Sequence, residues 1–167
     1  MRILGIDPGL ATTGWAIVDY SANGKVLTLI DYGIVGTKAG LDTPTRLVEI
    51  NSDLQEIIDR FKPDISSIEL LLFNNNAKTA MVVGEARGTI LYTLKKNGLE
   101  IYQFTPPQIK SSITGSGNAN KKQVQENVKR LCNLDNLPKP DDAADAVAIA
   151  VCCFDHLRMN NILKIQV

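Results

Sequence analysis

The sequence has 167 residues, which is enough for one domain that buries a hydrophobic core of its own. Hydrophobic residues make up 44% and charged residues 22%, and no low-complexity tract occurs, which excludes the disordered and fibrous classes. Eighteen basic and eighteen acidic residues cancel, which excludes a protein that coats nucleic acid by bulk positive charge. We expect one globular domain over residues 1–167, in which local charge decides what is bound.

The first 63 residues predict three strands and a helix. Arg2–Asp7 is a short apolar run before the turn signal Pro8-Gly9, and it is too short and too polar at its end for a signal peptide or a membrane span. Thr13–Tyr20 and Lys25–Val35 complete an antiparallel meander. Thr43 as the cap and Pro44 at the first helical position then predict an amphipathic helix that ends before Pro63.

The middle of the chain alternates between strand and helix. Asp64–Leu72 and Leu99–Phe104 have the composition of strands, and Ala77–Leu94 between them has helical spacing. Gly84 and Gly88 lie one turn apart in this helix, where each costs about 1 kcal/mol relative to alanine. Two such glycines on one side predict a close backbone approach to a neighbouring helix.

The last third of the chain is predicted to be helical. A short helix covers Gln108–Ile113, a second begins at or near Asn120, and a third covers Asp141–Leu157. The third is apolar almost all round, so we expect it to be largely buried. The order of elements predicts an α/β fold with a five-stranded mixed sheet flanked by helices.

The three cysteines and the N-terminal pattern indicate a reducing compartment, and we expect a cytoplasmic protein with no membrane contact. Their number is odd, and two of them are adjacent, so we expect free thiols that fill the core: Cys132, Cys152 and Cys153. A zinc site is the alternative. Only His156 lies nearby, however, and no Cys-x-x-Cys spacing occurs.

Four acidic residues stand in positions that point to function. Asp7 is the last residue of the first predicted strand, where its side chain can stand in the open at the edge of the sheet. Glu69 lies within an apolar strand, where a buried carboxylate is costly without a positive partner. Asp142 and Asp145 are three residues apart in the last helix, so they share one face and repel each other. Taken singly, each acid is also explained by a turn, a helix start or an ion pair with a lysine.

Together the four carboxylates predict a divalent-metal site. Carboxylate oxygens without a His or Cys cluster are hard ligands that suit Mg²⁺, with Mn²⁺ as a substitute, rather than zinc. Two ions about 3.5–4 Å apart orient a water nucleophile and stabilise the leaving oxygen in phosphodiester hydrolysis. We expect a basic surface beside them, because the segment from Lys110 to Arg130 carries five basic residues against Glu126 alone. A solvated helix surface explains this charge equally well.

Four segments resemble the RuvC-type Holliday-junction resolvases, which have an RNase H-like fold. They agree with that family in order and spacing, over nearly the whole chain: Leu4–Gly9, Ile68-Glu69, Gly84–Gly88 and Asp142–Ala150. The resemblance implies a homodimeric endonuclease that resolves four-way DNA junctions by paired symmetric nicks, with two Mg²⁺ ions per active site. Partners implied in the same way are the branch-migration proteins RuvA and RuvB.

The resemblance also assigns roles to residues. It makes metal ligands of the four acids Asp7, Glu69, Asp142 and Asp145, and catalytic, DNA-contacting residues of Lys110 and Lys121. We also expect Lys122, next to Lys121 in the basic segment, to contact DNA. The helix with Gly84 and Gly88 is similar to the one at the family's dimer interface. The chain departs from the family pattern at Leu72, where an aromatic residue that stacks on bases is expected, and at Asn75, where a lysine is expected. Phe73 is the candidate to take over the stacking.

Three alternatives remain open from the sequence. The Gly5–Gly9 turn also resembles the first phosphate loop of actin-like ATPases, but those enzymes pair two lobes and this chain has room for one. A junction-binding scaffold that does not cut would explain the departures at Leu72 and Asn75, but it has no need of Glu69. An RNase H-like nuclease for ribosomal RNA precursors shares the opening motif, and the Asp142/Asp145 pair favours the resolvases over it.

Overall fold

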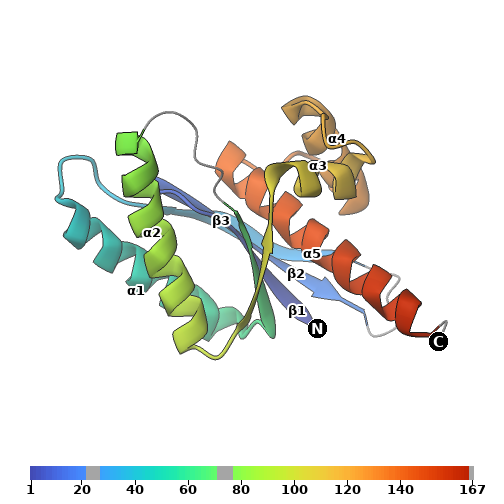
Figure 1. The fold of residues 1–167 in the computed structure, drawn as a ribbon, viewed down its shortest axis with the longest axis horizontal. Coiled ribbons are helices and arrows are strands. Elements are labelled where there is room, and N and C mark those ends of the chain that lie inside the picture. Colours follow the sequence, from blue (N-terminus) through green and yellow to red (C-terminus); the bar gives the residue numbers. More distant parts are fainter. Residues whose placement is uncertain (22–26, 71–76, 166–167) are drawn as a thin grey trace.

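The computed structural model describes residues 1–21, 27–70 and 77–165 (Figure 1). Five strands form one sheet in the order β3-β2-β1-β4-β5. Their bounds are β1 Arg2–Asp7, β2 Thr12–Tyr20, β3 Leu27–Gly36, β4 Ile65–Glu69 and β5 Glu100–Phe104. β2 runs antiparallel to both β1 and β3, whereas β4 runs parallel to both β1 and β5. The prediction of a five-stranded mixed sheet is confirmed.

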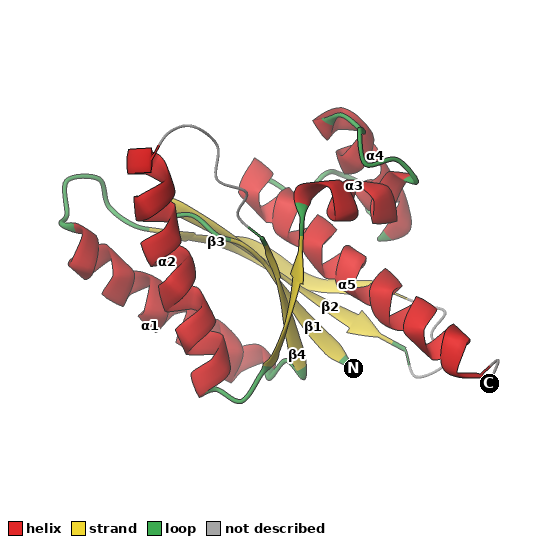
Figure 2. Ribbon diagram, viewed as in Figure 1, coloured by secondary structure: helices red, strands yellow, loops and turns green. Residues whose placement is uncertain are grey.

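Helices cover both faces of this sheet (Figure 2). Their bounds are α1 Thr43–Phe61, α2 Ala77–Lys96, α3 Pro106–Thr114, α4 Lys121–Leu131 and α5 Asp141–Ile165. α1 and α2 pack together on one face, and α5 crosses the other face with α3 and α4 beside it. In the part of the chain that the structure describes, no helix is both long and apolar enough to cross a membrane.

Alternation along the strands divides the hydrophobic core between the two faces. Leu4 and Ile6 of β1 pack with α1 and α2, whereas Ile3 packs with α5. Because successive strand residues point to opposite faces, Gly5 and Asp7 face the same side as Ile3, which is the side of α5. The geometry of β1 therefore directs Asp7 toward the last helix.

Two glycines let α5 lie directly on the strands. A Cβ at Gly5 would lie 2.4 Å from the main-chain oxygen of Ala146, and one at Gly14 would lie 2.0 Å from that of Asp142. Neither distance is possible for a real side chain, so any other residue would push α5 away from β1 and β2. The start of α5 is thereby brought to the edge of the sheet where β1 ends.

The structure corrects three local predictions. The cap of α1 is Asp42, and Thr43 and Pro44 lie in its first turn, so the helix begins one residue earlier than the Thr-Pro signal suggests. β4 ends at Glu69 in the described residues, so Leu70 is no longer strand. Apart from the adjoining backbone of α2, no described atom lies within 4 Å of a Cβ built on Gly84 or Gly88, so the described residues do not make the close helix contact predicted there.

The cysteines behave as predicted from their number and spacing. Cys132, Cys152 and Cys153 are buried and free, in the core between the sheet and α5. Burial raises the pKa of the Cys132 and Cys152 thiols to about 11 and that of Cys153 to about 12. They are protonated core residues, and the ring of nearby His156 packs edge-on against Phe104.

Candidate active site

Two of the four acids end neighbouring parallel strands. Asp7 is the last residue of β1 and Glu69 the last residue of β4, and Ile6 pairs with Ile68 in the residue before each. The carboxyl ends of parallel strands meet at one edge of a sheet, so the two carboxylates come together there. Ser67, two residues before Glu69, donates a hydrogen bond to the Ile149 carbonyl of α5, so this side of β4 also faces α5.

The other two acids come from the first turns of α5, which lies over the same edge. Asp142 and Asp145 are both partly exposed, in a helix that is otherwise buried from Ala143 to Cys153. Gly14 holds the Asp142 main chain against β2, opposite Asp7 in the β1–β2 pairing. The predicted group of four acids is therefore assembled from β1, β4 and α5.

Electrostatics link these acids. Burial first, and then the charges of Asp145, Glu69 and Asp142, together raise the pKa of Asp7 to about 7, although Lys121 acts to lower it. The pKa of Glu69 is raised by burial and by Asp145, against the opposing charge of Lys110. The sequence suggested an open Asp7 and a deeply buried Glu69. Instead both are partly exposed, and the largest rise falls on Asp7, because β4 ends at Glu69 whereas Asp7 lies among the other acids.

Lys121, the first residue of α4, bridges two acids of α5. Its Nζ lies 3.0 Å from Asp141 Oδ2 and 3.2 Å from Asp145 Oδ2. Burial lowers the pKa of Lys121, but its bonds to these two acids outweigh burial and raise it. Burial nevertheless keeps the pKa of Asp145 raised, with the charges of Asp141 and Asp142 acting in the same direction, although the Lys121 contact lowers it. One lysine therefore does not compensate the negative charge of the group.

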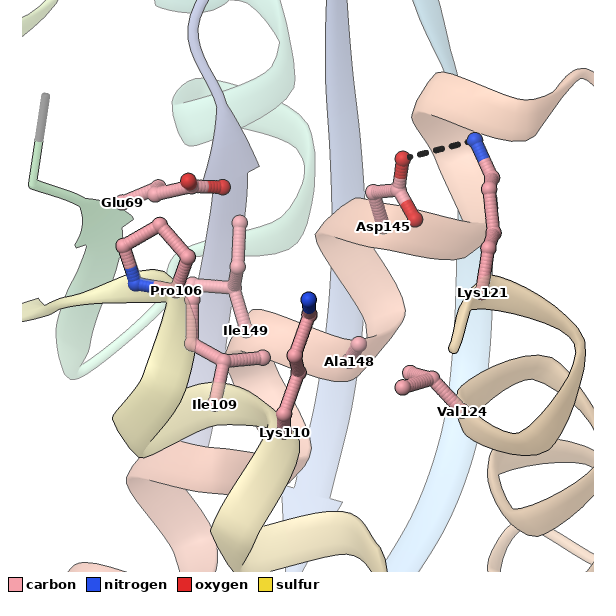
Figure 3. A pocket seen from close by; sticks show the side chains of 9 residues that line it. All are labelled: Glu69, Pro106, Ile109, Lys110, Lys121, Val124, Asp145, Ala148 and Ile149. Atoms are coloured by element: carbon pink, nitrogen blue, oxygen red, sulfur yellow. Dashed lines mark hydrogen bonds and ion pairs between the residues drawn. The ribbon is translucent and has the colours of Figure 1, made fainter. Parts of the chain in front are cut away.

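A cavity of about 290 Å³ opens between these elements, and Figure 3 shows the side chains around it. Glu69 and Asp145 stand at its rim, and the ammonium of Lys110, from α3, points toward the space between them. Apolar side chains form its floor, namely Pro106, Ile109, Val124, Ala148 and Ile149. Lys110 and Lys121, predicted as a pair from the sequence, thus line one cavity.

Of the other predicted DNA contacts, the structure describes only Lys122, which does not line this cavity. Lys122 is highly exposed and lies 3.9 Å from Glu126 in an ion pair one helical turn along α4. Phe73, Leu72 and Asn75 lie outside the described residues. The predicted roles of Lys122 and Phe73 therefore remain predictions.

The donor chemistry at this edge fits a hard divalent cation. All four candidate ligands are carboxylates, and Asp7, Glu69 and Asp145 have raised pKa values, which a nearby cation would lower again. Asp145 is turned toward Lys121 (Figure 3), and in the described ranges no three His, Cys, Asp or Glu side chains converge closely enough to hold one ion as they stand. Binding would therefore require side-chain rotations of the acids, for which their partial exposure leaves room.

Two further residues matter that the sequence did not single out. Asp141 shares Lys121 with Asp145 and accepts a second hydrogen bond, 3.3 Å from Gln125 Nε2. Arg87 donates to the main-chain oxygen of Glu69 at 3.2 Å. Arg87 could have been found from the sequence, because it lies in the Gly84–Gly88 motif. Asp141 could not, because an acid at this position also fits an ordinary helix start.

Comparison with known proteins identifies the family. The model of "Crossover junction endodeoxyribonuclease RuvC" matches residues 3–153 of the chain. The chain belongs to the RuvC family. It is 49% identical to the RuvC protein of Caldicellulosiruptor saccharolyticus over 91% of both chains, and 46% identical to that of Alkaliphilus metalliredigens over 99% of this chain and 100% of the other. The RuvC family is one of divalent-metal nucleases, in agreement with the all-carboxylate donor set.

Solved RuvC structures have the same fold. The Thermus thermophilus RuvC structure superposes with a TM-score of 0.88 at 30% identity, covering 96% of this chain and 97% of the other. The same protein in complex with a Holliday junction substrate superposes with a TM-score of 0.86 at 27% identity, covering 95% and 96%. The match to RuvC settles the choice between the nuclease families that the opening motif left open, in favour of the crossover junction endodeoxyribonucleases.

Proposed function

We propose that this chain resolves four-way DNA junctions as a homodimer, making paired symmetric nicks by hydrolysis of phosphodiester bonds. The observation that carries the proposal is the undercompensated group of acids at the ends of β1 and β4 under the start of α5, beside a cavity lined by two lysines. The RuvC family names this reaction, and a relative has been solved with a Holliday junction substrate.

In this proposal Asp7, Glu69, Asp142 and Asp145 hold two Mg²⁺ ions, for which Mn²⁺ substitutes. When bound, the ions supply charge stabilisation at the cut phosphate and at the attacking water. Lys110 of α3 and Lys121 of α4, which both line the cavity, neutralise charge on the phosphate oxygens. Asp141 keeps the ammonium of Lys121 at the rim after Asp145 turns to the metal, because its own contact of 3.0 Å does not depend on Asp145.

The test uses synthetic four-way junctions in Mg²⁺. The wild type should nick them symmetrically, and Asp7→Asn should bind the junction but not cut it. Asp59→Asn is the matched control, because Asp59 accepts hydrogen bonds from Gln55 and Lys62 and does not line the cavity. Retained cutting by Asp7→Asn, or loss of cutting by Asp59→Asn, would overturn the assignment.

The two lysines have a separate test. Lys110→Met and Lys121→Met should each slow nicking by about a hundredfold while junction affinity changes far less, because each acts on charge that develops during the reaction. Lys62→Met, which removes an exposed pair with Asp59, should leave the rate unchanged.

The predicted DNA contacts are tested by binding. Lys122→Ala should weaken binding to all junctions alike, and the slope of log affinity against log salt concentration should fall by about one. If neither Phe73→Ala nor Leu72→Ala weakens junction binding, the proposed stacking role is ruled out.

The proposed dimer face is the outer side of α1 and α2. Val48, Met81 and Tyr92 are exposed there by 66%, 64% and 62%. Gly88 lines a groove between the two helices, and a Cβ there would come within 4 Å of no described residue beyond its own turn of α2. Gly88→Arg should therefore fold normally and yield a monomer by mass measurement in solution, whereas a wild-type monomer would leave paired nicking unexplained. RuvA and RuvB as partners, and the cytoplasm as compartment, complete the proposal.

A further inference from the structure

Arg87 of α2 is bonded to the ends of two strands at once. Its Nε donates to the main-chain oxygen of Glu69, the last residue of β4, at 3.2 Å. Its Nη2 donates to the side-chain oxygen of Gln103 in β5, the residue that pairs with Ile68. The guanidinium therefore joins α2, β4 and β5 at the edge of the sheet where the acids gather.

Both of these strand ends lead into the cavity. Glu69 projects its carboxylate there from the end of β4. β5 ends at Phe104, whose carbonyl accepts from the Leu70 amide at 2.8 Å, and Thr105 then caps α3 through a capping box with Gln108. Lys110, one helical turn into α3, lines the same cavity. The position of β4 relative to β5 thus determines how Glu69 and Lys110 face each other.

The surroundings of Arg87 favour a positioning role over an ordinary ion pair. Burial lowers the pKa of its guanidinium, and within residues 1–21, 27–70 and 77–165 no carboxylate lies in ion-pair contact with it. Its donors are directed at neutral acceptors on two different strands. A planar guanidinium with donors in a fixed fork sets the geometry of both acceptors, which a lysine ammonium cannot do.

We propose that Arg87 is a positioning residue that holds Glu69 and Lys110 in register across the cavity. The inference rests on the proposed roles of those two residues, and it adds a role for the arginine of the Gly84–Gly88 motif. Arg87 lies behind the main chain of Glu69 and acts on the bound metal only through the orientation of that carboxylate.

The first measurement is the affinity of the full chain for Mn²⁺ without DNA, with binding detected by electron paramagnetic resonance. Arg87→Ala should weaken Mn²⁺ binding by about tenfold, as removal of a residue that orients a ligand does elsewhere. Arg87→Lys should recover only part of this loss, because a single ammonium nitrogen replaces the planar set of guanidinium donors. Arg46→Ala is the matched control: Arg46 is also partly buried and bonds to a neutral acceptor, Thr37 Oγ1, at 2.7 Å.

A double-mutant cycle tests whether Arg87 acts through Glu69. In a Glu69→Gln background, Arg87→Ala should cause no further loss of Mn²⁺ affinity, whereas in an Asp142→Asn background it should still cost about tenfold. Equal losses in both backgrounds, or a loss in Arg46→Ala as large as in Arg87→Ala, would overturn the inference in favour of a general structural role. Gln103→Ala provides a second variant in case Arg87→Ala fails to fold, and an unchanged Mn²⁺ affinity in Gln103→Ala and Arg87→Lys would also overturn it.

Nicking of four-way junctions separates this inference from the proposed function. If Arg87 positions Glu69, Arg87→Ala should cut about tenfold more slowly at limiting Mg²⁺ and regain much of the rate at high Mg²⁺, with junction affinity unchanged. A wild type that cuts, a Glu69→Gln variant that does not, and an Arg87→Ala variant with wild-type metal dependence would reject the inference alone. A wild type that does not cut, or a Glu69→Gln variant that cuts normally, would reject the proposed function.

Discussion

The two ends of the β1–β2 ladder carry charge in opposite ways. At one end Arg2 lies opposite Asp19, and its Nε and Nη2 each donate to a carboxylate oxygen at 2.8 Å. At the other end Asp7 lies opposite Gly14, which has no side chain and is covered by the start of α5. The ladder thus carries a neutralised acid, Asp19, at one end and an acid that faces other acids, Asp7, at the other.

The pKa values follow this difference. The hydrogen bond from Arg2 lowers the pKa of Asp19, whereas burial and three neighbouring acids raise the pKa of Asp7 to about 7. A carboxylate that stabilises the fold is matched by a positive group of the same chain. At the proposed active site the chain leaves negative charge that only an ion from solution can match. The following predictions test this contrast.

The largest effect is expected for Gly14→Ala. A Cβ at Gly14 would lie 2.0 Å from the Asp142 main-chain oxygen, so α5 must shift away from β2 and carry Asp142 and Asp145 with it. We expect the free energy of unfolding to fall by about 3 kcal/mol in urea titrations, at the upper end for overpacking, and nicking to be largely lost. Gly36→Ala is the control, because a Cβ built there comes within 4 Å of no other described residue except its neighbours in the chain. Equal stability of the two variants would contradict the close approach of α5.

The second prediction concerns metal and stability. Mg²⁺ at about 100 times its Kd should stabilise the wild type by about 2.7 kcal/mol, because only the folded chain assembles the four acids. Calorimetry should show the melting temperature rising by several degrees. Asp7→Asn should lose most of this response and Asp19→Asn should keep all of it. A response that survives in Asp7→Asn would show that the ion binds elsewhere.

The third prediction concerns pH in the absence of metal. The pKa of Asp7 is raised in the folded state, so the stability it contributes is complete below its unfolded pKa near 3.8 and is lost as the pH rises through about 7. Asp7→Asn removes this loss and should be more stable than the wild type at pH 8 by about 2 kcal/mol in EDTA, allowing for solvent screening. Urea unfolding at pH 5 and pH 8 measures the difference. The raised pKa would be contradicted if the wild type did not lose stability between pH 5 and pH 8 and Asp7→Asn had the same free energy of unfolding at both.

The sequence predicted the order of strands and helices because each element has a clear apolar period and a turn signal beside it. It also predicted which acids gather, since Asp7 ends a strand and Asp142 and Asp145 share a helical face. Burial of single side chains was less predictable. The apolar run around Glu69 does not reveal that β4 ends at that residue, so the sequence overestimated the burial of Glu69. It underestimated the burial of Asp7, which lies among the other acids.

Contacts between distant elements were beyond the sequence for a different reason. Lys121 and Asp141 meet only because α4 packs beside α5, and Arg87 reaches Glu69 only because α2 lies against the end of β4. No periodicity encodes these pairs. The glycines of α2 illustrate the same limit: Gly84 and Gly88 mark an open helix surface, but the sequence does not distinguish a neighbour within the chain from a second copy.

The smallest effect is expected at the opposite end of the ladder. The pKa of Asp19 is lowered by Arg2, so its contribution to stability is complete above its unfolded pKa near 3.8 and is lost as the pH falls through the lower folded value. Asp19→Asn should cost about 0.5–1 kcal/mol at pH 7, because the pair is a third exposed and screened by solvent. The same Asp→Asn change should thus destabilise the fold at position 19 and stabilise it at position 7 in EDTA at pH 8. Changes of equal sign at the two positions would mean that the chain compensates both acids alike, and the negative charge at the proposed metal site would then need no ion.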